Sequence, residues 1–135
     1  MDGRVVRALQ AAREAEKGQA LFYRTLAAAA EEAGDEVLSE RFNELHADEQ
    51  HHVSRLTARL LELGASPADL AHVRAGEAAL EGWEAVARGR EEEEVARYEA
   101  LLGEGPDGTT EAVIRTILEA ERHHAAELGG KWTPA

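Results

Sequence analysis

The pattern Glu-x-x-His occurs twice in this chain, near its middle as Glu49–His52 and near its C-terminus as Glu121–His124. Residues three positions apart lie on the same face of a helix, so each copy predicts a carboxylate beside an imidazole. Both copies interrupt a row of apolar residues that has helical spacing. The chain must therefore fold so that two helices turn ionisable groups toward its core.

Amphipathic helices account for nearly the whole sequence. Aromatic residues make up 4% and there are three prolines, while Ala, Leu, Glu and Arg dominate, which favours helices over strands. In the second predicted helix the apolar row on both sides of the motif consists of Leu38, Phe42, Leu45, Leu56, Leu60 and Leu63. We expect an all-α fold in a single domain, residues 1–135.

Turn signals divide the chain into two antiparallel helical hairpins. Gly34 and the following Asp make a very short connection, and residues 103–108 form a turn rich in Gly with one Pro. We expect the first hairpin at about 3–63, a connection at 64–76, and the second hairpin at about 77–129, with a short C-terminal tail.

Capping residues predict where several helices begin. Asp2 can cap the first helix, and Thr109 or Thr110 the last. Ser66 and Pro67 have the pattern of a helix start, which predicts a short helix or an early beginning of the third one.

The two hairpins repeat one another. Glu16 is followed seven positions later by Tyr23, and Glu91 is followed at the same spacing by Tyr98; the chain has no other tyrosine. The order Glu…Tyr, Glu-x-x-His, Glu…Tyr, Glu-x-x-His is an internal repeat of a hairpin. It predicts that four carboxylates and two imidazoles meet in the core of a four-helix bundle.

Such a cluster of buried carboxylates needs cations, because unpaired carboxylates away from water are costly and repel one another. Arg90 is the nearest basic residue, and one arginine is too few. Glu from two helices with Glu-x-x-His from the other two is the arrangement of a di-iron or di-manganese centre. Since the chain has no cysteine, thiolate sites are excluded, and oxygen with nitrogen ligands favours iron, manganese or a mixture.

With these motifs the chain resembles, over nearly all of its length, the rubrerythrin branch of the ferritin-like di-iron carboxylate superfamily, here without a rubredoxin domain. The resemblance implies a ferritin-like four-helix bundle in which Glu49 and Glu121 bridge two iron ions. The remaining ligands that it implies are Glu16, His52, Glu91 and His124.

The same resemblance implies roles for three further residues in the reaction. Tyr23 and Tyr98 would donate hydrogen bonds that orient ligand carboxylates. Glu94 would be an additional metal ligand toward which one iron moves when the redox state changes. Its counterpart in the first half is Gln19, so we expect the two metal positions to differ.

The residue before each motif breaks the repeat. Asp48 stands before Glu49 and is a candidate acceptor that orients a histidine, with a solvated acid as the equal alternative. The corresponding residue in the last helix is Ala120. His51 and His123 are expected to point away from the centre, because neighbouring residues on a helix differ by about 100°.

By this resemblance we expect a di-iron peroxidase that reduces hydrogen peroxide or dioxygen with electrons from an external rubredoxin-like or flavoprotein donor. From the N-terminal sequence, which does not have the pattern of a signal peptide, we expect a cytoplasmic protein. The alternatives are a ferroxidase or iron-storage protein and a structural bundle with vestigial ligands. A net charge of −12 excludes nucleic acid and anionic membranes as partners, and no signal peptide or membrane-spanning stretch is visible.

The connection also bears on oligomerisation. If one chain completes its own bundle, the second and third helices run parallel and the connection has to climb roughly 40 Å. Residues 64–76 reach that distance only when almost fully extended, at about 3.3 Å each. We therefore expect a homodimer. Its two chains either exchange hairpins, so that each site is built from both chains, or each chain completes its own bundle.

Overall fold

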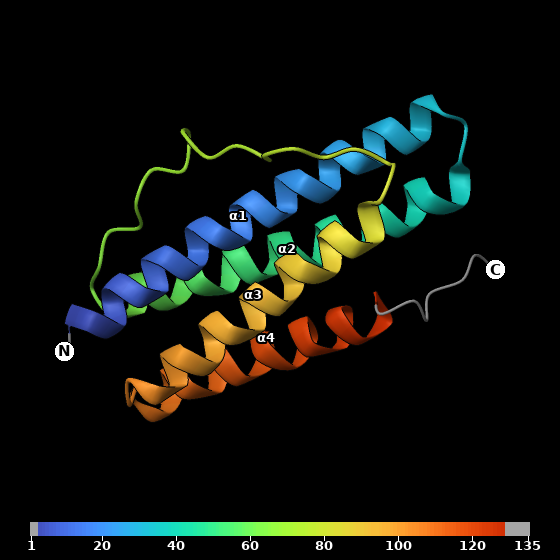
Figure 1. Ribbon diagram of the computed structural model, residues 1–135. Helices are drawn as coiled ribbons and strands as arrows, with labels where there is room; N and C mark the ends of the chain where they lie inside the picture. Colours follow the sequence, from blue (N-terminus) through green and yellow to red (C-terminus); the bar gives the residue numbers. More distant parts are fainter. Residues whose placement is uncertain (1–2, 129–135) are drawn as a thin grey trace.

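The computed structural model describes residues 3–128 and places four α-helices in one bundle (Figure 1). They are α1 (Gly3–Glu32), α2 (Glu36–Glu62), α3 (Trp83–Gly103) and α4 (Gly108–Glu127). Within the described residues there is no strand, so the predicted all-α fold is confirmed.

Short polar side chains fix two of the helix starts. Asp35 caps α2, because its carboxylate accepts a hydrogen bond from the backbone N–H of Leu38 at 3.1 Å. Asp107 caps α4 by accepting from the N–H of Thr110 at 2.9 Å. The prediction of Thr109 or Thr110 as this cap is wrong, since Asp107 takes the position first. The predicted cap Asp2 and the predicted tail lie outside the described residues.

The hairpins α1–α2 and α3–α4 pack so that α2 and α3 run parallel, as a single-chain bundle requires (Figure 1). Two arginines of α2 join it to α4 at both ends of the bundle. Arg41 pairs with Glu127 at 2.7 Å, and Arg59 reaches Asp107 at 3.1 Å. These contacts fix the register of the second hairpin on the first.

The long connection between the hairpins crosses the outside of the bundle along α1 (Figure 1). No helix forms between residues 65 and 82, so the helix start predicted at Ser66 and Pro67 is wrong. The reason is tertiary: Gln10 bonds the carbonyl of Ser66 and the N–H of Ala68, and Arg13 bonds the carbonyl of Ala68. These side chains occupy backbone groups that a helix would use.

The third helix begins at Trp83 rather than near residue 77, so the connection is longer than predicted. One chain therefore closes its own bundle, and the linker-length reason for hairpin exchange does not hold. The homodimer itself stays a prediction.

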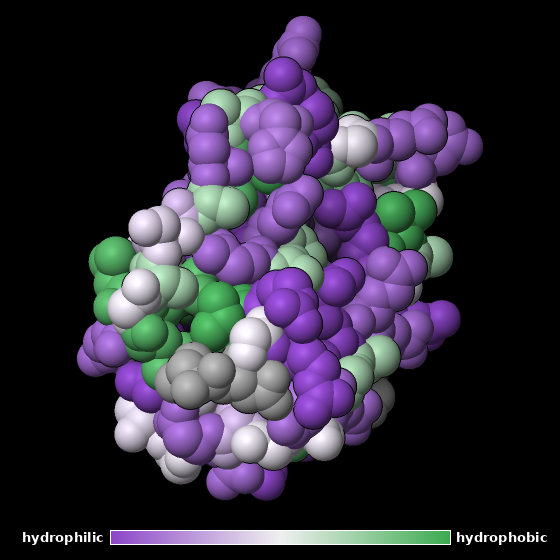
Figure 2. All heavy atoms as spheres, turned by 90° about the vertical axis from the view of Figure 1, so that its left-hand side faces the viewer, coloured by the Kyte–Doolittle hydropathy of each residue, from purple (hydrophilic) through white to green (hydrophobic). Residues whose placement is uncertain are grey.

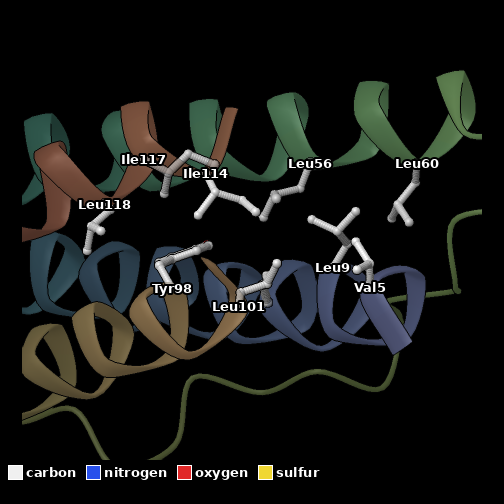
Figure 3. Packing of buried hydrophobic residues seen from close by; sticks show 10 residues of the cluster. Val5, Leu9, Leu56, Leu60, Tyr98, Leu101, Ile114, Ile117 and Leu118 are labelled. Atoms are coloured by element: carbon white, nitrogen blue, oxygen red, sulfur yellow. The ribbon is translucent and has the colours of Figure 1, made fainter. Parts of the chain in front are cut away.

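The apolar core is divided into two clusters, one at each end of the bundle. Figure 3 shows the cluster at the end where α1 and α4 begin, in which side chains of all four helices point toward one another. Leu9, Leu56, Tyr98 and Ile117 are fully buried there. The other cluster contains Phe22, Phe42 and Leu128 among others. The stretch between the clusters is left to polar residues.

The outer surface is mainly hydrophilic. Figure 2 views the end of the bundle at which α1 begins, where hydrophilic residues predominate and the larger hydrophobic area lies at the left of the view. Among the described residues, no helix combines the length and the apolar character that crossing a membrane requires.

Candidate metal centre

Six of the seven predicted metal ligands meet at mid-height of the bundle, between the two apolar clusters. Each of the four helices contributes: α1 and α3 supply one glutamate each, and α2 and α4 supply a Glu-x-x-His pair each. All are buried, with exposed fractions of 5% or less; they are Glu16, Glu49, His52, Glu91, Glu121 and His124. The two residues of each Glu-x-x-His pair thus lie on the side of their helix that faces the core, as their spacing predicts.

These side chains form two groups, each with ligand atoms that all lie within 4.8 Å of one another. The first consists of Glu16, His52 and the shared pair Glu49 and Glu121. The second consists of Glu91, His124 and the same shared pair. Two neighbouring positions that share two carboxylates have the form of a carboxylate-bridged dinuclear centre.

The atoms that point into the centre have no hydrogen-bond partner among the described residues. Both oxygens of Glu49 and of Glu121 are in this state, as are one oxygen each of Glu16 and Glu91 and Nδ1 of both histidines. Buried polar atoms are almost always hydrogen-bonded. A group of unpaired atoms this large at one point indicates a missing partner. Divalent cations satisfy all of them at once, and the oxygen and nitrogen donors fit a di-iron site.

Both imidazoles turn Nδ1 toward the carboxylates. Nδ1 of His52 lies 3.3 Å from Glu121 and 3.4 Å from Glu16. Nδ1 of His124 lies 3.3 Å from both Glu49 and Glu121. Each histidine therefore offers Nδ1 to a metal and keeps Nε2 for an outer partner.

In the absence of cations, burial and mutual repulsion favour protonation of some of the carboxylates in the centre. Burial, reinforced by the charges of Glu16, Glu91 and Glu121, raises the pKa of Glu49 well above its ordinary value. Burial alone would lower the pKa of His52, but the nearby carboxylates of Glu121 and Glu16 outweigh it and raise that pKa to about 9. The cluster is thus poised to exchange protons for metal ions.

The two tyrosines each bond a carboxylate of the opposite hairpin. The hydroxyl of Tyr23 donates to Glu91 at 2.7 Å, and that of Tyr98 donates to Glu16 at 2.7 Å. Burial, together with the nearby carboxylates, raises the pKa of both tyrosines, so their protons stay in place as donors. The geometry agrees with the predicted hydrogen-bond role, while a part in the reaction stays a prediction.

Glu94 lies beside the two groups and belongs to neither. It is 5% exposed, one of its oxygens has no hydrogen-bond partner, and the other lies 3.9 Å from Nε of Arg97. Burial and the charges of Glu16 and Glu121 raise its pKa to about 9. Its predicted role as a metal ligand stays a prediction. Arg97 was not anticipated, although its i,i+3 spacing from Glu94 was a visible signal.

Gln19 occupies the corresponding place in the first half and is hydrogen-bonded through both its nitrogen and its oxygen. Its amide donates to Glu91 at 3.1 Å and accepts from Nε of Arg90 at 2.6 Å. Arg90, the nearest basic residue in the sequence, therefore acts on the amide rather than on the ligand carboxylates.

Asp48 is the outer partner of a histidine. Nε2 of His124 lies 3.0 Å from its carboxylate, and this hydrogen bond, opposed by partial burial, lowers the pKa of Asp48. Its orienting role is thus favoured over that of a merely solvated acid. His51 and His123 are exposed, as expected.

Comparison with known proteins adds the fold family. No protein-family model and no curated protein sequence matches the chain. A bacterioferritin of Rhodobacter capsulatus, described with a metal-free dinuclear site and haem iron, has a TM-score of 0.84 at 21% identity, over 95% of this chain and 82% of its own. A bacterioferritin of Mycobacterium tuberculosis has a TM-score of 0.85 at 20% identity, over 97% of this chain and 85% of its own.

Both of these structures are bacterioferritins, so the comparisons support the ferritin-like fold and do not confirm the narrower rubrerythrin branch. At these identities the likeness concerns the fold. The chain has the ferritin-like four-helix bundle fold.

Proposed function

We propose that this protein is a ferroxidase-type di-iron protein, which binds two ferrous ions in its core and oxidises them. The observation that carries this proposal is the set of inward-pointing ligand atoms without partners, arranged as two groups that share Glu49 and Glu121. The likeness to bacterioferritins, one of them described with a dinuclear site, supports it over the expected peroxidase.

The ligand set suits ferrous iron as the substrate. Each position offers three carboxylates and one imidazole, a combination that iron and manganese accept and softer metals do not prefer. The shared carboxylates hold two ions close enough to act on one oxidant molecule. Two ferrous ions give up two electrons, which with two protons reduce one hydrogen peroxide to two waters; dioxygen requires four electrons.

The residues of the chain orient this chemistry. Tyr23 and Tyr98 hold the terminal carboxylates in place, so that the ligand set changes little between metal-free and metal-bound states. The flanking apolar clusters keep water from the centre, which strengthens every electrostatic interaction inside it.

Anaerobic titration with ferrous iron, followed by mixing with oxygen or peroxide, tests the proposal. We expect two ferrous ions per bundle, loss of both in Glu49→Ala, and ferric iron accumulating beyond two per bundle on repeated additions. Glu92→Ala is the matched control, because Glu92 is exposed on α3 beside Glu91. A wild-type chain that binds no ferrous iron would favour a structural bundle with vestigial ligands.

A second candidate is the peroxide reductase expected from the resemblance, fed by an external electron donor. The observation that favours it is Glu94, a buried carboxylate one helical turn after Glu91 at the place of the extra rubrerythrin ligand. Rapid peroxide consumption with exactly the initial iron retained, and no net oxidation of added ferrous iron, would identify this activity instead.

A further inference from the structure

A cavity of about 410 Å³ lies between α1, α3 and the connection that crosses α1 (Figure 1). Three arginines form part of its wall: Arg74 of the connection, and Arg90 and Arg97 of α3. Guanidinium groups bind carboxylates and phosphates through paired N–H groups, and they bind them better than ammonium groups do. In a chain whose net charge is −12, this wall is therefore a candidate site for an anion.

Three glutamates share the wall, but none of them occupies the arginines with a close ion pair. Glu14 contacts His72 at 3.2 Å. Glu94 is 5% exposed and comes no closer than 3.9 Å, to Nε of Arg97. Glu93 is exposed and forms no ion pair with these arginines within residues 3–128. A ligand anion therefore does not have to displace a bound carboxylate.

Each arginine keeps N–H groups that the described residues do not use. Arg97 makes no hydrogen bond to any residue between 3 and 128. Arg74 uses only Nη1, on two carbonyls of the connection, which leaves Nε and Nη2. Arg90 uses Nε and Nη2, on two residues of α1, which leaves Nη1. Donors from two separate segments are thus available at one cavity.

Arg90 is held in position before a ligand arrives. Its guanidinium lies over the ring of Phe22, 4.3 Å from the centroid. Its Nε donates to Gln19 at 2.6 Å and its Nη2 to the carbonyl of Gly18 at 3.4 Å. The remaining nitrogen faces the connection, since a Cβ added to Gly76 would lie 3.7 Å from Nη1. A donor fixed in this way loses little entropy when it binds.

The size and the wall of the cavity indicate an organic acid rather than a bare inorganic ion. At about 30 Å³ for each water, the cavity has room for on the order of ten water-sized groups, more than a single oxyanion fills. Ala15, Gly18 and Val73 give part of its wall an apolar character, which suits a hydrocarbon segment. A short acid with a carboxylate at each end can contact more than one arginine.

The cavity is joined to the candidate metal centre by two hydrogen bonds. Arg90 donates to the amide oxygen of Gln19, and the amide nitrogen of Gln19 donates to Glu91 at 3.1 Å. A carboxylate bound to Arg90 takes up part of the charge that polarises this amide. It therefore changes the hydrogen bond that Glu91 receives.

We propose that this cavity binds a small organic acid, that Arg74, Arg90 and Arg97 hold its carboxylates, and that the bound acid acts on the metal centre through Gln19. Binding of the acid does not depend on the proposed two-metal function. Its effect on the centre rests on that function, so the two parts are tested separately.

Calorimetric titration of the metal-free full chain with succinate, after both metal and chelator have been removed, tests the binding site. We expect one succinate per chain, and much weaker binding of inorganic phosphate and of the uncharged succinamide. Arg74→Gln and Arg97→Gln should each weaken succinate binding by about tenfold. Arg88→Gln is the matched control, because Arg88 is exposed on α3 and does not line the cavity.

A second titration measures the effect on the centre. The chain is loaded with two Co²⁺ ions, a redox-stable substitute for ferrous iron, and its visible absorption is recorded while succinate is added. We expect a saturable change whose midpoint moves by about tenfold to higher succinate in Arg74→Gln and in Arg97→Gln. Gln19→Leu, which interrupts the two hydrogen bonds, should still bind succinate but show no change in absorption.

The outcomes separate the site from the proposed function. No succinate binding by the metal-free wild type, or equal weakening in Arg88→Gln, overturns the site. Phosphate bound as tightly as succinate by the same arginines overturns the organic acid as its ligand. An absorption change whose midpoint the arginine variants do not move means that succinate binds Co²⁺ directly, and it overturns the effect through Gln19, as does an unchanged absorption. Failure to bind two Co²⁺ ions contradicts the proposed function, and the effect on the centre with it, while the metal-free titration still decides the site.

Discussion

Glu49 and Glu121 are buried carboxylates that cost the fold stability and that the proposed metal centre needs. Each is completely buried, and neither has a hydrogen-bond partner for its oxygens among the described residues. Glu49 has a pKa raised by burial, whereas the imidazoles of His124 and His52, each with Nδ1 3.3 Å from the carboxylate, outweigh burial and lower the pKa of Glu121. The two shared carboxylates of the metal-free centre therefore divide into one that tends to be neutral and one that tends to be charged.

Replacing Glu49 by Gln should separate stability from metal binding. A carboxyl whose pKa is raised on folding destabilises the folded state at neutral pH, and one pKa unit corresponds to about 1.4 kcal/mol. Glu49→Gln should thus raise the free energy of unfolding of the metal-free protein, while it abolishes binding of two metals. Urea unfolding in the presence of chelator, together with metal analysis, measures both. A destabilised metal-free variant would contradict this interpretation of Glu49.

The tyrosine hydroxyls allow each metal position to be perturbed by itself. Tyr23→Phe removes a donor from Glu91, and Tyr98→Phe removes the donor from Glu16. Each substitution should weaken one metal by about tenfold to a hundredfold and leave the other near its original affinity. Competition titrations with a chromophoric chelator resolve the two affinities. Equal weakening of both metals by either variant would show that the hydroxyls act on the centre as a whole.

The sequence predicted the residues of the candidate site better than it predicted their hydrogen-bond partners. The candidate ligands could be predicted because Glu-x-x-His and Glu…Tyr spacings are properties of a single helix. That Tyr23 bonds Glu91 and that Asp48 bonds His124 depends on the register between different helices, which no spacing within one helix contains. Where the repeat breaks, at Gln19 and at Ala120, the sequence did indicate that the two positions differ.

The helices and the connection between the hairpins show the same limit of prediction from local sequence. Four helices and their pairing into two hairpins followed from periodicity and turn residues, whereas the parallel run of α2 and α3 was expected only if one chain completes its own bundle. The connection did not, because Ser66 and Pro67 have a local preference for a helix start that Gln10 and Arg13 override from α1. Tertiary contacts of this kind outweigh local propensity, which is a weak preference of a few tenths of a kcal/mol per residue.

Metal ions should act as a clamp between the two hairpins. Each ligand group combines residues of both hairpins: Glu16 and His52 with Glu121 in one, and Glu49 with Glu91 and His124 in the other. Ligand present at about 100 times its dissociation constant adds about 2.7 kcal/mol, which for a domain of this size raises Tm by on the order of 10 °C. Calorimetry before and after chelation measures this shift, and Glu49→Ala should show none. An equal shift in that variant would place the metal elsewhere.

The net charge of the whole molecule and the charges of the centre both influence metal binding. A net charge of −12 attracts divalent cations to the surface, while the described core holds carboxylates that repel each other until cations or protons neutralise them. Stability and metal binding therefore depend on pH through the same groups.

The metal-free protein should become less stable as pH rises from about 5 to about 9. The pKa of Glu94 is raised to about 9 and that of Glu91 to about 7, so each destabilises the fold once pH exceeds the ordinary value near 4.5. The pKa of His52 is also raised to about 9, so its stabilising contribution is complete below about 6.5 and disappears as pH rises through 9. All three contributions have the same sign.

Metal displaces these protons, so the gain in Tm on adding Co²⁺ should widen over the same range. Thermal unfolding at pH 5.5, 7 and 8.5, with chelator or with metal, measures both trends, and Glu94→Gln should flatten the metal-free one. A metal-free Tm that rises with pH would mean that these carboxyls are ionised in the folded protein and that protons do not substitute for the cations.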